Sequence, residues 1–290
     1  MDKQQIPAIR LENISKSFGS IRANINVNLS VYRGEILAIL GENGSGKTTL
    51  MNMISGIYYP DSGRIYIDGE EAIIASPKDA FRYKIGMIHQ HFKLVDVFSA
   101  TENIMLGVDD GKKFSEKDAR AKVVEISEKY GFLIDPDKKI YQMSVSEKQT
   151  VEIVKVLYRG ADILILDEPT AVLTPQETEK LFRVLRKMRD DGKAIVIITH
   201  KMHEVKSLSD RVAVLRGGRY IGSLVTKDTD VNTMTDMMVG HAVTLNIERP
   251  EPVNPKPRIE VEGLTVRNEE GIVKLKDVSF TANSGEILGI

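Results

Sequence analysis

The sequence predicts an α/β fold organised around a phosphate-binding loop, and three observations support this prediction. Residues 41–48 read Gly-Glu-Asn-Gly-Ser-Gly-Lys-Thr and fit the pattern G-x-x-x-x-G-K-[ST] at every fixed position. The apolar run before the loop, residues 35–40, is typical of a buried parallel strand, and residues 48–55 after it are expected to form a helix. Two further apolar runs, residues 163–166 and 194–199, also have the length and composition of buried strands.

A strand, a glycine-rich loop and a helix N-terminus together form an anion site, because the glycines let backbone N–H groups turn inward. We expect Lys47 to reach the β- and γ-phosphates of a nucleotide and the Thr48 hydroxyl to bind Mg²⁺. The alternative, a Gly/Ser-rich turn that fits the pattern by chance, is disfavoured by the flanking strand and helix. The residues predicted to contact the nucleotide here are Gly41, Glu42, Asn43, Gly44, Ser45, Gly46, Lys47, Thr48 and Thr49.

Composition excludes several classes of function. The 290 residues suffice for one large domain or two smaller ones, and the formal net charge of −1 provides no basic field for nucleic acid. The chain has no cysteine, so disulfides and thiolate metal sites are excluded. The polar start lacks the apolar core of a signal peptide, and no uncharged apolar run approaches the roughly 18 residues of a membrane span. We therefore expect a soluble, intracellular chain.

The N-terminal region is predicted to contain strands joined by a polar loop. Residues 8–14 and 21–31 alternate as strands do, and the loop 15–20 between them carries Phe18. An aromatic ring in such a loop can stack on adenine, but taken alone the residue is more typical of an ordinary core phenylalanine. Residues 64–69 follow a turn and are predicted to form an edge strand.

A short strand over residues 84–91 ends in a polar cluster that contains His89, Gln90 and His91. The two histidines share one face of a strand and resemble a metal pair, but no third ligand lies nearby in the sequence, so a solvated loop is favoured. Gln90 is the better candidate for a functional residue, because its side-chain amide can contact Mg²⁺ or the attacking water.

Two later segments carry helix-capping signals. Ser144 and Glu147 have the spacing of a capping box, and a helix is predicted to follow residues 141–150 and to continue through Tyr158. This structural interpretation suffices for the two residues taken alone. A second capping box, residues 174–177, predicts a helix that runs to about residue 191.

The apolar run 163–166 ends in two adjacent carboxylates, Asp167 and Glu168. In open α/β sheets, ligands bind at the carboxyl ends of the strands. Because neighbouring residues on a strand point to opposite sides, we expect Asp167 to bind Mg²⁺ and Glu168 to orient and deprotonate the attacking water. His200 follows the strand 194–199 at the same edge of the sheet. Although a single histidine is usually structural, this position favours a contact with the γ-phosphate.

The sequence begins again near its end. Residues 9–15 are echoed by residues 259–265, and the second copy stops one strand short of where its own phosphate loop would lie. We therefore expect a first nucleotide-binding domain over residues 1–245, a Pro-rich linker over residues 246–257, and the truncated start of a second domain over residues 258–290. On this interpretation the chain is a fragment.

The motifs, taken in order, resemble the nucleotide-binding domain of ATP-binding-cassette (ABC) transporters over about residues 8–245. This ordered set is highly specific, and the tandem repeat is similar to the ATPases of bacterial simple-sugar and nucleoside importers. The matching segments are Phe18 for the adenine-stacking aromatic, 41–48 for Walker A, Gln90 for the Q-loop, 144–149 for the signature, 163–168 for Walker B, 171–174 for the D-loop and His200 for the switch histidine.

The resemblance implies a P-loop NTPase fold of the ABC ATPase type, with an antiparallel β subdomain and a helical (signature) subdomain. It implies ATP and Mg²⁺ as cofactors and ATP hydrolysis that energises a transmembrane permease served by a substrate-binding lipoprotein, at the cytoplasmic face of the membrane. Two cassettes, either the tandem pair or a homodimer, would sandwich ATP. The implied roles are catalysis for Glu168, His200 and Gln90, metal binding for Thr48, Gln90 and Asp167, and contact with the opposing subunit's ATP for Ser144, Ser146 and Glu147.

Two positions depart from the family pattern. Ser146 stands where the signature usually has a glycine whose N–H approaches the γ-phosphate. Loss of this one contact is expected to lower a rate by about 10²–10³ unless the serine hydroxyl replaces it. Thr174 stands where the D-loop usually has Asp. The alternatives are a degenerate cassette that binds ATP without turnover and a soluble tandem ATPase acting on ribosomes or DNA. The short Pro-rich linker and the balanced charge argue against the ribosome or DNA class.

Overall fold

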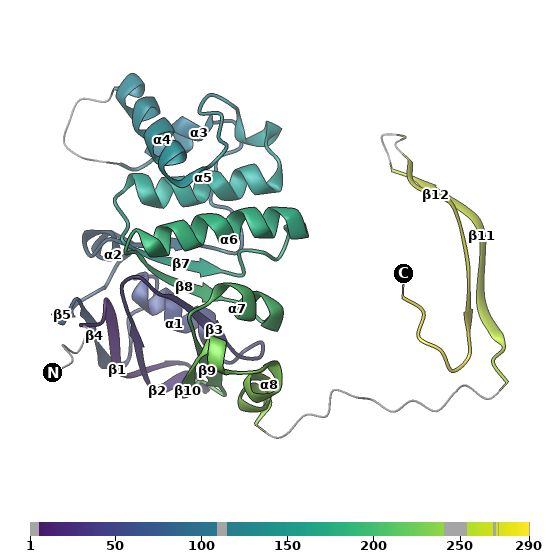
Figure 1. Cartoon of the computed structure of the whole chain (residues 1–290), viewed down its shortest axis with the longest axis horizontal. Helices are drawn as coiled ribbons and strands as arrows, with labels where there is room; N and C mark the ends of the chain where they lie inside the picture. Colours follow the sequence, from purple (N-terminus) through teal and green to yellow (C-terminus); the bar gives the residue numbers. More distant parts are fainter. Residues whose placement is uncertain (1–5, 109–114, 241–253, 269–270, 272, 290) are drawn as a thin grey trace. The chain divides into compact units, whose positions relative to one another are not determined.

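The structure, a computed structural model, describes residues 6–108, 115–240, 254–268, 271 and 273–289. The chain divides into two compact units, Met1–Val243 and Thr244–Ile290, and each is described by itself (Figure 1). The first unit contains an antiparallel sheet, a larger mainly parallel sheet and the helices that cover it. This architecture confirms the predicted fold class.

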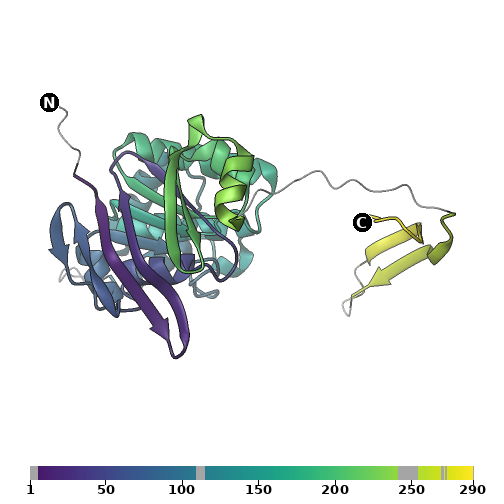
Figure 2. The ribbon, with the colours of Figure 1, turned by 90° about the horizontal axis from the view of Figure 1, so that it is seen from below.

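The antiparallel sheet has the order β2-β1-β4-β5. Its strands are β1 (Ile9–Phe18), β2 (Ile21–Val31), β4 (Ser62–Ile67) and β5 (Glu70–Ala72). Two predictions are wrong here. The polar loop expected at residues 15–20 is mostly strand, because β1 pairs with β2 as far as Phe18↔Ile21 (Figure 2). The strand expected at an edge, β4, is internal, because it pairs with both β1 and β5.

The larger sheet has the order β10-β9-β3-β8-β7-β6, with β10 antiparallel to β9 and the other strands parallel. Its strands are β3 (Ile36–Leu40), β6 (Ile85–Ile88), β7 (Ile163–Asp167), β8 (Ala194–Ile198), β9 (Arg211–Arg216) and β10 (Arg219–Val225). Every residue of β3, β7 and β8 is buried, which explains their nearly continuous apolar sequences. Parallel strands place their carboxyl ends at one edge, so the loops after β3, β6, β7 and β8 converge there.

The helix predicted from the capping box at residues 174–177 forms, with its start and end close to those expected. The helices are α1 (Lys47–Ile54), α2 (Pro77–Arg82), α3 (Ala100–Met105), α4 (Glu116–Tyr130), α5 (Val145–Tyr158), α6 (Pro175–Asp190), α7 (Met202–Leu208) and α8 (Val231–Val239), with 3₁₀ turns at Ile140–Gln142 and Thr226–Asp228. The start of α5 was predicted too late, because the capping box of Ser144 already opens the helix at Val145. Of the helices in the described ranges, none is both long enough and apolar enough to cross a bilayer.

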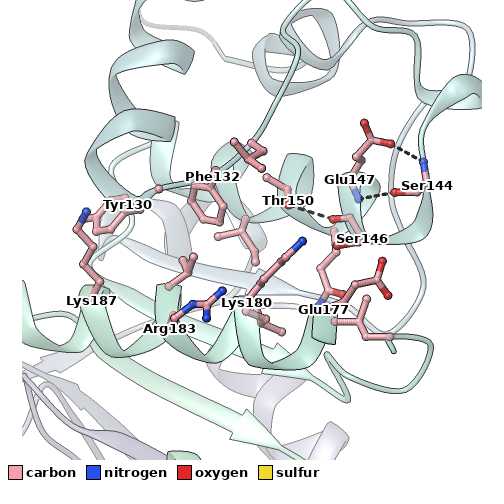
Figure 3. Close-up of a pocket in the computed structure, with 17 residues that line it drawn as sticks. Tyr130, Phe132, Ser144, Ser146, Glu147, Thr150, Glu177, Lys180, Arg183 and Lys187 are labelled. Atoms are coloured by element: carbon pink, nitrogen blue, oxygen red, sulfur yellow. Dashed lines mark hydrogen bonds between the residues drawn. The ribbon is translucent and has the colours of Figure 1, made fainter. Parts of the chain in front are cut away.

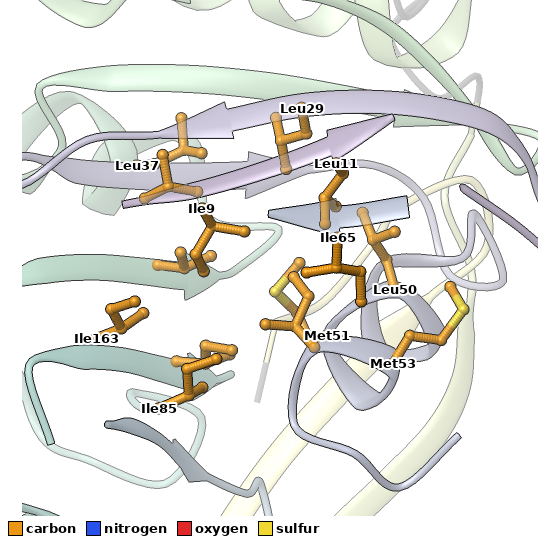
Figure 4. Packing of buried hydrophobic residues seen from close by; sticks show 14 of the residues in the cluster. Ile9, Leu11, Leu29, Leu37, Leu50, Met51, Met53, Ile65, Ile85 and Ile163 are labelled. Atoms are coloured by element: carbon orange, nitrogen blue, oxygen red, sulfur yellow. The ribbon is translucent and has the colours of Figure 1, made fainter. Parts of the chain in front are cut away.

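A buried apolar cluster joins the two sheets to α1 (Figure 4). Ile9 and Leu11 come from β1, Leu37 from β3, Ile163 from β7 and Met51 from α1. Burial of each such side chain contributes about 1.5–3 kcal/mol, so the strand before the phosphate loop and the helix after it are both firmly held. A separate apolar cluster packs α6 against the opposite face of the larger sheet.

A helical subdomain lies beyond the sheet, where α3, α4 and α5 pack on one another (Figure 1). Its own small core includes Ala100, Ile104, Val123, Val151 and Val154. The resemblance implied both this subdomain and the antiparallel β subdomain, and the structure confirms that both are present.

The second unit is a hairpin of β11 (Pro257–Arg267) and β12 (Val273–Asn283). Two positions with a positive φ angle in the β1–β2 hairpin recur at the matching positions of this hairpin. Asn13 and Asn26 have positive φ angles of 52° and 48°, and their counterparts Gly263 and Asp277 have 60° and 51°. Most of the predicted linker, residues 246–253, lies outside the described residues.

The hydrogen bonds around these irregular positions repeat as well. The backbone N–H of Asn26 donates to the hydroxyl of Ser15 at 2.9 Å, and that of Asp277 donates to the hydroxyl of Thr265 at 3.1 Å. The second unit therefore has the local geometry of the first hairpin as well as a similar sequence.

Candidate active site

The loops at the carboxyl edge of the larger sheet enclose a cavity of about 570 Å³. Twelve of the residues predicted to bind or act on a nucleotide line it: Phe18, Asn43, Gly44, Ser45, Gly46, Lys47, Thr48, Thr49, Gln90, Asp167, Glu168 and His200. Gly41 and Glu42 are not among the residues that line the cavity, but their carbonyl oxygens accept hydrogen bonds from Lys47. Segments far apart in the sequence thus meet in one place.

The phosphate loop depends on Gly46, which precedes α1 and has a φ angle of 94°. A Cβ atom at this position would lie 2.2 Å from the carbonyl oxygen of Ala23 and 2.7 Å from Nδ2 of Asn24, so only glycine fits. Asn24 also donates from Nδ2 to the Gly46 carbonyl at 3.2 Å. In the described part of the chain, no side chain caps the first turn of α1, which leaves its N–H groups available for an anion.

Lys47 is buried and points back into the loop. Its Nζ donates to the carbonyl oxygens of Gly41 at 2.7 Å and Glu42 at 2.9 Å. Burial lowers the pKa of Lys47, while the nearby charges of Glu168 and Asp167 oppose this shift. The ammonium group is therefore a desolvated cation with only neutral hydrogen-bond partners, which is a suitable arrangement for binding an incoming phosphate.

Asp167 ends β7 and is 6% exposed. Burial raises its pKa, whereas a hydrogen bond with the Thr48 side chain and the nearby Lys47 and His89 lower it. A hydroxyl and a carboxylate side by side are suitable oxygen ligands for Mg²⁺. Among the described residues, however, no group of three or more His, Cys, Asp or Glu side chains could hold a metal ion, so Mg²⁺ would need additional oxygens from phosphate and water.

Glu168 and His200 are in direct contact, with His200 Nδ1 2.9 Å from Glu168 Oε1. Glu168 does not continue the strand as expected. Its φ angle is 48°, so a turn in the backbone, rather than strand alternation, sets the direction of its side chain. Its other oxygen, Oε2, is buried and has no hydrogen-bond partner within the described ranges. A buried acceptor without a partner is energetically costly.

Phe18 and Gln90 also line the cavity. The Phe18 side chain is 42% exposed and contacts Tyr58 edge to face, with ring centroids 5.1 Å apart. The alternative interpretation of Phe18 as a core residue is therefore wrong. His89 is only partly buried, and burial, together with the charge of Lys93, lowers its pKa.

The signature residues lie elsewhere in the first unit. Ser144, Ser146 and Glu147 line a separate cavity of about 630 Å³ between α4, α5 and α6 (Figure 3). Glu147 Oε2 accepts from the Ser144 N–H at 2.7 Å, so the capping box forms as predicted. The phosphate loop and the signature residues of this chain therefore belong to different cavities.

Two connections between motifs were missed. Gln149 in α5 donates from Nε2 to the carbonyl of Pro169, two residues beyond Asp167, at 2.7 Å. Glu204 in α7 is buried and accepts a hydrogen bond from Thr170, two residues after Glu168; its other contacts are described below. The Gln149–Pro169 and Thr170–Glu204 hydrogen bonds join residues at least 20 positions apart, so no local pattern in the sequence could have indicated them.

Comparison with known families agrees with this arrangement. A family described as "ABC transporter" matches residues 25–171, which is just over half of the chain. The chain belongs to the ABC transporter family. Among curated relatives, it is 42% identical over 284 residues to the nucleoside import ATP-binding protein NupA of Lactococcus lactis and 44% identical over 284 residues to the guanosine import ATP-binding protein NupO of Bacillus subtilis. In both cases 97% of this chain and 56% of the relative are covered, so the chain spans just over half of their length.

Solved cassettes share the fold of the first unit. A nucleotide-free ATP-binding cassette from an ABC transporter matches with a TM-score of 0.71 at 25% identity, covering 81% of this chain and 95% of the other. A dimeric cassette in a post-hydrolysis state, bound to ADP and Pi, matches with a TM-score of 0.65 at 27% identity, covering 76% of this chain and 99% of the other. Nucleotide binding is therefore observed in proteins of this fold.

Proposed function

We propose that this chain binds Mg-ATP, hydrolyses it, and drives the import of a nucleoside or sugar through a membrane permease. The observation that carries the proposal is the contact between Glu168 and His200 in the cavity that also contains Lys47, Thr48 and Asp167. Phosphate-binding, metal-binding and base functions are thus grouped in one place. Phosphoryl transfer needs these three functions and little covalent chemistry from the protein.

In this proposal, the N–H groups at the start of α1 and the Lys47 ammonium hold the phosphates, and Phe18 stacks on adenine. Thr48, Asp167 and Gln90 bind Mg²⁺, which neutralises charge on the phosphates. Glu168, which lines the cavity, binds the attacking water and accepts its proton. His200 holds Oε1 of that carboxylate and contacts the γ-phosphate.

A complete ATP site needs a second cassette. The separation of the two cavities supports an arrangement in which Ser144, Ser146 and Glu147 of one cassette cover the phosphate loop of another. We propose that residues 1–245 are the first cassette, 246–257 a linker, and 258–290 the start of a second cassette, since the second unit repeats the β1–β2 hairpin. The partner cassette is then either that second copy or the first unit of another chain.

The names of the relatives support the class of transported solute. They include nucleoside, guanosine and ribose import ATP-binding proteins. We propose that this chain docks on transmembrane permease subunits at the cytoplasmic face, with a lipoprotein delivering the solute. Co-purification of the permease and the lipoprotein supports this proposal, whereas co-purification of ribosomes supports the soluble tandem class.

Replacement of the proposed base tests the enzymatic part. Glu168→Gln keeps a side chain of the same shape but removes the base, so ATP binding is retained and hydrolysis falls by about 10²-fold or more. Glu179→Gln, on an exposed part of α6, removes one carboxylate without effect on either quantity. Hydrolysis by Glu168→Gln at the wild-type rate contradicts the assignment of the base. Tight ATP binding without turnover by the unmodified chain indicates the degenerate cassette, a possibility that Ser146 raises.

A further inference from the structure

A buried carboxylate outside the recognised motifs connects the two segments that carry the catalytic candidates. Glu204, in the first turn of α7, is 4% exposed. Its Oε2 accepts from the Thr170 hydroxyl at 2.6 Å and lies 3.4 Å from the Thr199 hydroxyl. Its Oε1 pairs with Lys201 Nζ at 3.0 Å. A buried carboxylate with this many partners is held in one position.

The positions of these partners along the chain are informative. Thr170 lies two residues after Glu168, while Thr199 and Lys201 flank His200 directly. Lys201 Nζ also donates to the Thr170 carbonyl at 3.0 Å, and the Lys201 N–H donates to the Thr199 hydroxyl at 3.1 Å. These hydrogen bonds therefore connect the segment after β7 to the segment after β8, next to the Glu168–His200 contact.

We infer that Glu204 and Thr170 are positioning residues that set the distance between Glu168 and His200. This inference rests on the proposed function. The hydrogen bond from Thr170 to Glu204 fixes the backbone that follows Glu168, and the contacts of Lys201 and Thr199 fix the backbone on either side of His200. Misplacement of a catalytic group by about 1 Å can lower a rate about 10²-fold, so small errors in this network affect turnover more than binding.

A simpler role for Glu204 makes a different prediction. A carboxylate in the first turn of a helix stabilises the helix dipole, and Glu204 occupies that position in α7. This role does not involve the Thr170 hydroxyl. Substitutions at Thr170 therefore distinguish positioning from helix stabilisation, and they avoid the folding defect that removal of a buried charge at Glu204 can cause.

The test compares Thr170→Val, which has the same shape but no hydroxyl, with Thr170→Ser, which keeps the hydroxyl. We expect Thr170→Val to lower kcat about tenfold or more while the ATP dissociation constant changes less than about twofold. Thr170→Ser retains the wild-type rate. Thr235→Val is the control, because it removes a hydroxyl that bonds to the Val231 carbonyl in α8. Equal activity of Thr170→Val and wild type, or a parallel loss of ATP binding, overturns the inference.

A second measurement does not depend on turnover. The NMR signal of the His200 ring reports its contact with Glu168, and Glu168→Gln gives the position of that signal when the contact is altered. We expect Thr170→Val, but not Thr170→Ser, to move the signal towards that position. An unmoved signal in Thr170→Val overturns the positioning role. If the wild type hydrolyses no ATP but the signal moves as expected, the proposed function fails and the positioning role stands.

Discussion

The Nε2 atom of Gln149 donates a hydrogen bond of 2.7 Å to the carbonyl oxygen of Pro169. This bond joins α5 to the loop after β7. Gln149 is 5% exposed and lies one turn after Ser146 in the signature helix. Pro169 directly follows Glu168. A buried hydrogen bond thus connects the helical subdomain to the segment that carries the proposed base, so a rotation of α5 would act on this segment.

Removal of this bond is expected to destabilise the first unit. Gln149→Leu preserves side-chain volume but leaves the Pro169 carbonyl buried without its donor, which lowers the free energy of unfolding by about 1–3 kcal/mol. Chemical denaturation measures the difference. The control is Gln176→Leu, at an exposed position of α6, where a change within about 0.5 kcal/mol is expected. Equal stability of the two variants would show that the Gln149 bond contributes nothing.

The requirement for glycine at position 46 can be separated from the general strain of a positive φ angle. Gly46→Ala and Gly192→Ala both place a Cβ on backbone with φ near 90°, which costs about 1–2 kcal/mol. At Gly192 nothing lies within 4 Å of the new atom, whereas at Gly46 the Ala23 carbonyl lies at 2.2 Å. Gly46→Ala is therefore expected to be the less stable variant, and only it should weaken ATP binding. Similar losses of stability in unfolding experiments would contradict the steric argument.

Asp167→Asn is expected to stabilise the nucleotide-free protein at neutral pH while it abolishes Mg-dependent hydrolysis. The pKa of Asp167 is raised by burial, so folding favours the protonated form. The stabilisation from the protonated carboxyl is present at low pH and is lost as the pH rises through the folded-state pKa of Asp167. At pH 7 the ionised carboxylate is therefore unfavourable to folding. Replacement by a neutral amide should raise Tm at pH 7.

The pH dependence of this effect provides its control. The gain in Tm should shrink as the pH falls through the folded-state pKa of Asp167, because the wild-type carboxyl then becomes neutral as well. Thermal unfolding of both proteins across this range measures the difference. A lower Tm for Asp167→Asn at neutral pH would mean that the partners Thr48 and Lys47 outweigh the effect of burial.

The features that the sequence predicted correctly are those with local signals. The strands at Ile36–Leu40 and Ile163–Asp167 are continuous apolar runs, and the capping box at Ser144 forms as expected. The convergence of the phosphate loop, Asp167 and His200 was predictable, because parallel strands end at one edge of a sheet. Most of the Gly41–Thr48 pattern lines the cavity that contains Asp167 and His200.

The features that the sequence analysis missed depend on tertiary pairing. β4 was expected at an edge because its alternating sequence does not reveal that β5 pairs beside it. The extension of β1 to Phe18 was missed because residues 15–17 are polar and none of them is buried, so they carry no apolar alternation. The turn at Glu168, with φ of 48°, and the bond from Thr170 to Glu204 are set by the segments packed around them.

The central claim is that one cassette supplies the phosphate loop and another supplies the signature residues. Mixing two inactive chains tests it most directly: Glu168→Gln lacks the base, and Ser146→Arg blocks the signature surface. Each alone should be inactive, whereas an equal mixture should recover roughly a quarter of the wild-type rate of ATP hydrolysis, because half of the random pairs are mixed and each contains one intact site. No recovery, with an active wild type, or full activity of Ser146→Arg alone, would contradict the shared site.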